Sequence, residues 1–161
     1  MNDLQQPTVF IVDDDDAVRD SISELVESVG LPAAAYDSAL AFLAAIEPDR
    51  PGCLVLDVRM AEMSGLALQQ RLNGMGVALP VIILTGHGDV PMAVEAMKNG
   101  ALDFLQKPCR DQALLDSINA AVFLSGRIPA VLNFLSIMVQ VDPRGWTSTW
   151  MGSRVSGSEM R

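Results

Sequence analysis

Apolar runs of strand length alternate with stretches of helical spacing over the first 123 residues of this 161-residue chain. The runs expected to form strands are Thr8–Val12, Ala33–Tyr36, Cys53–Leu56, Pro80–Leu84 and Leu102–Leu105. Most of them are apolar throughout rather than alternating, which is typical of parallel strands covered on both faces. The second run is rich in alanine and fits a helix equally well, so only its place in the series favours a strand.

Five amphipathic stretches separate or follow these runs, and each has a start or stop signal of a helix. Their apolar positions are Val18, Ile22, Leu25, Val26 and Val29 before Gly30; Leu40, Phe42, Leu43 and Ile46 after Ser38; Leu66, Leu68 and Leu72 before Gly74; Val90, Val94 and Met97 before Gly100; and Leu114, Leu115, Ile118 and Val122 after Asp111. The fivefold alternation of strand and helix predicts an α/β fold with a doubly wound parallel sheet.

Polar residues follow four of the predicted strands. They are the run Asp13–Asp16, then Asp57, Thr85 and Lys107. Ligands of such a sheet bind beyond the carboxyl ends of the strands, so these groups are expected at one edge. Crowded carboxylates favour a hard cation such as Mg²⁺, and a hydroxyl and an ammonium stabilise charge on a transferring phosphoryl group.

Each of these residues also has a purely structural interpretation. An aspartate run before a helix is commonly a cap with a solvated charge cluster, and Asp57, Thr85 and Lys107 each fit a turn. For each residue considered alone, the structural interpretation is favoured. Taken together at one sheet edge, they favour a phosphoryl-transfer site.

Charge and cysteine content narrow the function classes. The net charge is −9, and residues 1–123 hold 7 basic against 18 acidic residues, a poor surface for nucleic acid. Cys53, Cys109 and the lone His87 lack metal-ligand spacing, so neither structural zinc nor a disulfide framework is expected. The N-terminus has no secretory signal pattern, which predicts a cytoplasmic protein.

Residues 124–161 depart from this pattern and are predicted to be an atypical tail after a domain of residues 1–123. The apolar stretch 128–141 is shorter than the ~20 residues needed to span a bilayer, so no membrane partner is expected. No helix-turn-helix pattern is present, and no DNA-binding domain is predicted. One hypothesis is a frameshift or truncation, which translation of the other two frames after codon ~124 tests; the other is a stand-alone domain whose apolar segment packs on itself or a partner.

Three segments carry a family resemblance: TVFIVDDDDAVR, CLVLDVRMAEMSGLAL and PVIILTGHGDVPMAVEAMKNGALDFLQKP. With the spacing between them, they resemble the receiver domain of bacterial two-component response regulators, in particular its FixJ-type branch. The resemblance covers residues 7–123. It implies a flavodoxin-like five-stranded sheet in the order 2-1-3-4-5.

The resemblance also implies roles for single residues. Asp57 would accept a phosphoryl group from a sensor histidine kinase, with Thr85 and Lys107 beside it. Mg²⁺ would be held by Asp13, Asp14, Asp57 and the main-chain carbonyl of Arg59. Phe104 matches an aromatic switch position, although a plain core phenylalanine is an equal alternative, and Pro108 matches a position where a cis peptide is usual. Two positions depart from the family pattern: Ala61 replaces a proline, and Cys109 replaces an aromatic residue.

On this interpretation the chain is not an enzyme beyond its own phosphoryl transfer. Phosphorylation would shift the 90–123 face, through which a homodimer is possible. A phosphatase of the haloacid-dehalogenase type also uses a strand-end Asp and Mg²⁺, but its D-x-D-x-[TV] motif fails at Ala17. The remaining alternative is an acidic interaction module that is not phosphorylated.

Overall fold

Five parallel strands form one sheet in the residues that the computed structural model describes, 6–86 and 90–125. The elements are β1 (Thr8–Val12), α1 (Asp16–Ser28), β2 (Ala33–Tyr36), α2 (Ala39–Ala45), β3 (Gly52–Leu56), α3 (Gly65–Gly74), β4 (Val81–Thr85), α4 (Val90–Lys98), β5 (Asp103–Gln106) and α5 (Asp111–Ser125). The chain divides into Met1–Arg127 and Ile128–Arg161, and all described residues belong to the first part.

The sheet has the strand order β2-β1-β3-β4-β5, with every neighbouring pair parallel. All residues of β1, β3 and β4 are buried, which explains why their sequences are apolar throughout. The predicted fold class and strand order are confirmed. The alanine-rich segment Ala33–Tyr36 is a strand, because it pairs with Val9–Val12 of β1.

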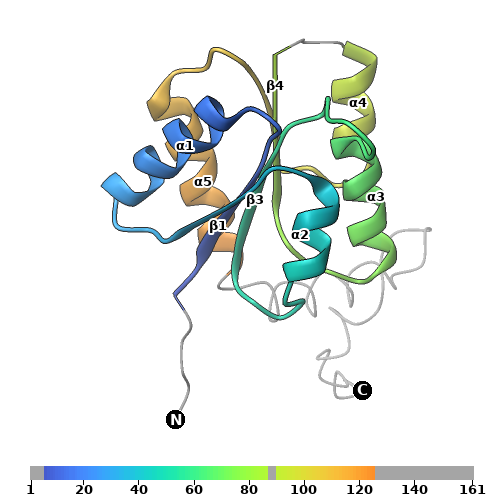
Figure 1. Cartoon of the computed structure of the whole chain (residues 1–161), viewed down its shortest axis with the longest axis horizontal. Coiled ribbons are helices and arrows are strands. Elements are labelled where there is room, and N and C mark those ends of the chain that lie inside the picture. Colours follow the sequence, from blue (N-terminus) through green and yellow to red (C-terminus); the bar gives the residue numbers. More distant parts are fainter. Residues whose placement is uncertain (1–5, 87–89, 126–161) are drawn as a thin grey trace, which may run out of the picture. The chain divides into compact units, whose positions relative to one another are not determined.

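Helices cover both faces of the sheet. Figure 1 shows α1 and α5 on one side, with α2, α3 and α4 on the other. Side chains of β1, β3 and β4 alternate between two apolar clusters, one around Ile22, Val26 and Ile118 and one around Phe42, Leu68 and Leu72. Because both faces of these strands are covered by apolar side chains, polar groups lie at the carboxyl ends of the strands, which form one edge of the sheet.

In two helices, apolar positions that marked the helix in the sequence are exposed rather than buried. In α2 the buried residues are Ala39 and Phe42, whereas Leu40, one of the apolar positions that marked the helix, is exposed because it lies about 100° around the helix from Ala39. In α4 the apolar stripe that marked the helix, Val90, Val94 and Met97, is exposed, and the residue it buries is Ala96. Helical periodicity located both helices, but the packing partner decided the buried face.

Helix ends agree with the predicted caps to within one or two residues. Ser38 caps α2, accepting a hydrogen bond from the Ala41 amide at 3.0 Å. Asp111 is the first residue of α5 rather than the residue before it, and α5 runs to Ser125, beyond the predicted end at 123. Helix ends fray, so shifts of one or two residues are common.

The start of α3 packs directly on the backbone that leaves β3. The Gly65 amide donates to the Val58 carbonyl at 2.9 Å. A Cβ at Gly65 would lie 2.2 Å from the Asp57 carbonyl oxygen, so a glycine is required there for steric reasons. The loop after Asp57 is therefore fixed by contact with α3.

We predict that Gly65→Ala lowers the free energy of unfolding by about 1–3 kcal/mol, because the backbone of the loop has to shift to admit the methyl group. Urea denaturation monitored by circular dichroism measures the change.

Gly74→Ala is the matched control at the other end of α3, since nothing lies within 4 Å of a Cβ there. It is expected to raise stability by about 0.5–1 kcal/mol, as alanine loses less backbone entropy than glycine in a helix. Equal effects from the two substitutions would show that the close approach at Gly65 is not what matters.

Candidate functional site

The strand order brings the predicted polar residues to one edge of the sheet. Asp13 and Asp14 directly follow β1, Asp57 follows β3, and Thr85 ends β4. Because β1, β3 and β4 are successive neighbours in the sheet, these residues end side by side. Lys107 follows β5, the next strand, and its amide donates to the Thr85 carbonyl at 2.7 Å.

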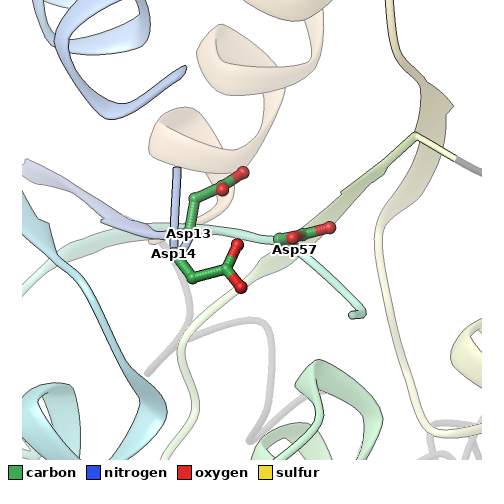
Figure 2. Close-up of side chains that lie close together, drawn as sticks. All are labelled: Asp13, Asp14 and Asp57. Carbon is green, nitrogen blue, oxygen red and sulfur yellow. The ribbon is translucent and has the colours of Figure 1, made fainter. Parts of the chain in front are cut away.

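Three carboxylates meet at the centre of this edge. One oxygen from each of Asp13, Asp14 and Asp57 lies within 4.8 Å of the other two. Figure 2 shows Asp13 and Asp14 at the end of β1 and Asp57 at the end of β3. Asp13 and Asp57 are buried and Asp14 is exposed, so the cluster opens to solvent on the side of Asp14. Oxygen donors in this arrangement suit a Mg²⁺ ion that keeps part of its water.

Lys107 supplies the compensating positive charge. Its Nζ lies 2.7 Å from Oδ2 of Asp13 and 3.8 Å from Oδ1 of Asp57. The ammonium is therefore nearer to Asp13 than to the residue predicted to be phosphorylated. Oδ1 of Asp13 is occupied by the Asp15 amide at 2.9 Å, so this buried carboxylate has a donor on each oxygen.

The carboxyl group of Asp57 is a weaker acid than that of an ordinary aspartate. Burial, followed by the negative charge of Asp13, raises its pKa from 3.8 to about 6. Lys107 and a hydrogen bond from the Arg59 amide act in the opposite direction and only partly offset this, and Asp14 adds a smaller upward contribution. A raised pKa in a charged cleft marks a functional-site candidate, and an added cation would lower it.

Two of the four aspartates in the run Asp13–Asp16 begin helix α1, and the other two belong to the carboxylate cluster. Asp15 caps α1, since its Oδ1 accepts from the amides of Ala17 at 2.9 Å and Val18 at 3.4 Å. Asp16 lies in the first turn of α1 and pairs with Arg19. The structural interpretation therefore holds for Asp15 and Asp16, whereas Asp13 and Asp14 lie in the carboxylate cluster.

The remaining predicted residues surround the cluster. Thr85 is fully buried, and Phe104, in β5, is half-buried against the cluster of Phe42 and Leu68. The Lys107–Pro108 peptide bond is cis. Arg59 is exposed, and its carbonyl as a metal ligand stays a prediction. His87 lies outside the described residues.

Sequence reasoning missed three residues that shape the site. Gly65 supports the backbone of Asp57, and the Arg19 guanidinium donates to the Asp13 carbonyl at 2.7 Å. Glu62 has φ +66° in the loop after β3, where the Met63 amide donates to the Ala61 carbonyl. A serine–glycine pair opening a helix was a readable signal for Gly65, but nothing in the sequence marked the other two.

Two further predictions concern cysteines and membranes. Both cysteines are free, and burial raises the pKa of the Cys53 thiol to about 12. Among the described residues, none of the helices combines the length and apolar character required for a membrane span.

The fold and the site together define a doubly wound α/β protein with three carboxylates and a lysine at the strand ends. Residues 9–119 match the family model of the response regulator receiver domain. The chain therefore belongs to the response regulator receiver family of two-component systems, and FixJ-type regulators are among its relatives.

Curated relatives are longer than this chain. TmoT, a response regulator protein of Ectopseudomonas mendocina, is 50% identical over 125 residues, 78% of this chain and 56% of TmoT. FixJ, a transcriptional regulatory protein of Azorhizobium caulinodans, is 53% identical over 114 residues, 71% of this chain and 54% of FixJ. The chain thus spans about half the length of these proteins.

A solved structure matches over nearly its whole length. The crystal structure of FixJ-N is 46% identical, with a TM-score of 0.68, and the match covers 74% of this chain and 95% of that one. The described fold is therefore that of a FixJ-type receiver domain.

We predict that Asp57→Asn stabilises the metal-free protein above pH 6 and has little effect near pH 4. The folded pKa of about 6 exceeds the unfolded value of 3.8, so ionisation of Asp57 favours the unfolded state, and stability is lost as the pH rises between these values. Asparagine does not ionise, so the Asp57→Asn protein does not lose this stability as the pH rises. The gain at pH about 8 should be on the order of 2 kcal/mol, after allowance for solvent near the carboxylate.

Urea unfolding in EDTA at several pH values measures this difference. Asp20→Asn, which neutralises an exposed aspartate of α1, is the control for losing one charge. A pH-independent difference for Asp57→Asn would refute the electrostatic explanation.

Proposed function

We propose that this chain accepts a phosphoryl group on Asp57 from the phosphohistidine of a sensor histidine kinase, in a Mg²⁺-dependent reaction that switches its conformation. The observation that carries the proposal is the group of Asp13, Asp14 and Asp57 within 4.8 Å, with the ammonium of Lys107 beside it. Family membership makes a two-component partner the natural donor.

The site residues fit a bound Mg²⁺. Asp13, Asp14 and Asp57, with the carbonyl of Arg59, would hold it through oxygen atoms alone, the donor set this ion prefers. When bound, Mg²⁺ neutralises negative charge on the carboxylates and on phosphoryl oxygens. The opening of the cluster on the side of Asp14 leaves room for its water ligands.

The chemistry is a transfer between two nucleophiles. A carboxylate oxygen of Asp57 forms the new P–O bond while the P–N bond of phosphohistidine breaks, and the leaving imidazole takes up a proton. Lys107, already 3.8 Å from Asp57, stabilises charge on the incoming oxygens. The Thr85 hydroxyl, at the end of the neighbouring strand, would donate to one of them.

Regulators of this family generally act as switches rather than enzymes, and the chain's self-directed phosphoryl transfer fits that pattern. The competing phosphatase requires a second carboxylate at Asp15, but Asp15 is engaged in capping α1. An unphosphorylated acidic module would not explain a lysine held against Asp13 beneath the open cluster.

The switch is proposed to run from Asp57 through Thr85 to Phe104. A phosphoryl group adds roughly −1.5 to −2 charge, which draws Thr85 and Lys107 toward it. Phe104 pairs with Ile83 of β4, two residues before Thr85, and is only half-buried, so it can pack more deeply when Thr85 moves. The result would be a shift of α4, β5 and α5.

A homodimer through this 90–123 face is the proposed consequence. Its exposed apolar residues include Val90, Val94 and Met97 of α4, and Ala93, Val94, Met97 and Lys98 line a hollow there. A second copy of the chain would cover these side chains. The proposed location of all these events is the cytoplasm.

We predict that the full chain incorporates ³²P from acetyl phosphate, or from a phosphorylated sensor kinase, when Mg²⁺ is present and not when EDTA replaces it. Asp57→Asn should lose all measurable label, because the acceptor oxygen is gone. Gel autoradiography measures incorporation.

Asp15→Asn is the matched control, since asparagine caps a helix about as well as aspartate. It should be labelled like the natural chain. Label retained by Asp57→Asn would disprove Asp57 as the acceptor, and label lost equally in both variants would point to misfolding.

We predict that phosphorylation promotes dimers and that Met97→Gln weakens the phosphorylated dimer roughly tenfold, as expected for losing about 1–2 kcal/mol of apolar contact. Sedimentation equilibrium with and without acetyl phosphate measures the dimer constant.

Met75→Gln, at the C-terminal cap of α3, is the control, since Met75 is 50% exposed and Met97 is 48% exposed. It should leave the dimer constant unchanged. Equal weakening by both variants, or a dimer that forms equally well in Asp57→Asn, would contradict a phosphorylation-dependent α4 interface.

A further inference from the structure

Arg19 reaches from α1 back to the acidic loop through both arms of its guanidinium. Nη1 donates to the main-chain oxygen of Asp13 at 2.7 Å, and Nη2 pairs with the carboxylate of Asp16. The Arg19 side chain is 15% exposed, whereas that of Asp16 is 88% exposed. Exposed ion pairs contribute little, so the partly buried bond to the Asp13 carbonyl is the contact with structural weight.

Asp13 has a partner at each of its hydrogen-bonding groups. Its amide donates to the Tyr36 carbonyl at 3.2 Å, Oδ1 accepts from Asp15, and Oδ2 accepts from Lys107. The bond from Arg19 is the one that orients its carbonyl. The peptide unit that follows is planar, so fixing this carbonyl also fixes the direction in which the chain reaches Asp14.

Asp14 needs such support more than its neighbours do. It is exposed at the open side of the cluster, where packing does not hold it. Repulsion from Asp13 and Asp57 would turn its side chain toward solvent. The backbone at Asp13 and the start of α1, two residues after Asp14, set the direction in which its side chain leaves the main chain.

We propose that Arg19 is a positioning residue for Mg²⁺ binding: it locks the peptide between Asp13 and Asp14 so that both carboxylates face Asp57. The inference rests on the proposed function, since it assigns to the same site the residue that orients its metal ligands.

The sign of the effect separates positioning from simple electrostatics. Arg19 is a cation near a cation site, so by charge alone its removal strengthens Mg²⁺ binding. By positioning, its removal weakens Mg²⁺ binding, because Asp14 is no longer directed into the site. The two explanations therefore predict opposite changes in the Mg²⁺ dissociation constant.

Isothermal titration of the metal-free full chain with MgCl₂, at fixed ionic strength, tests this without any phosphoryl transfer. Arg19→Gln should bind Mg²⁺ about tenfold more weakly, the usual loss when a group supporting a metal ligand is removed. Arg19→Lys keeps the charge but loses the two-armed fork, and should fall between. Asp16→Asn, which breaks only the exposed pair, should stay within about twofold.

Arg71→Gln is the matched control, because it makes the same change on the exposed surface of α3 and should leave the affinity unaltered. Asp14→Asn is the reference for losing a ligand. Thermal melts of each variant confirm that it is folded at the titration temperature. If Arg19→Gln does not fold, Arg19→Lys decides: weaker binding supports positioning, and unchanged binding overturns it.

Mg²⁺ binding by Arg19→Gln that equals or exceeds that of the natural chain would overturn the positioning role and leave the proposed function intact. Failure of the natural chain itself to bind Mg²⁺ would instead overturn the proposed function. The two failures are distinguished within one titration series.

Discussion

Repulsion among carboxylates at one edge of the sheet is the constraint on which the rest of the site depends. The strand order brings Asp13, Asp14 and Asp57 together, and the fully buried strands β1 and β3 cannot move apart to relieve them. Lys107 offsets part of the repulsion by pairing with Asp13. The remainder is expressed in the pKa of Asp57, which burial and Asp13 hold at about 6. The site is thus poised to take up positive charge, which is the property a metal-assisted phosphoryl acceptor needs.

Hydrogen bonds from α3 hold helix α4 and the residue that follows it. The amide of Gln69, in α3, donates to the Ala96 carbonyl at 2.9 Å, and that of Asn73 donates to the Asn99 carbonyl at 2.7 Å. Ala96 is the residue that α4 buries. Among the described residues, α4 and the residue after it thus accept hydrogen bonds from α3, while the apolar side chains Val90, Val94 and Met97 of α4 stay exposed.

The acidic segment Asp13–Asp16 makes two kinds of contact: local ones that begin α1, and long-range ones with the carboxylate of Asp57 and the ammonium of Lys107. Asp15 and Asp16 begin α1, whereas Asp13 and Asp14 face the cluster. Arg19 connects the two pairs by contacting Asp16 and the carbonyl of Asp13. One short segment therefore both starts a helix and supplies two of the three clustered carboxylates.

The sequence by itself determined the fold class and the identity of the strand-end residues, because buried parallel strands require continuous apolar runs and leave their polar groups at the ends. It did not determine which way α4 faces, since an apolar stripe looks the same whether a neighbour covers it or solvent does. The family resemblance already assigned Asp13 and Asp14 to the site, but the residues alone did not show which aspartate of the run would cap α1, because a helix cap and a metal ligand have the same side chain. Only the tertiary structure decided these points. It also decided that Lys107 lies nearer to Asp13 than to Asp57, and that Arg19 and Gly65 contact the backbone of Asp13 and Asp57. Most of these contacts depend on how segments distant in the sequence pack together.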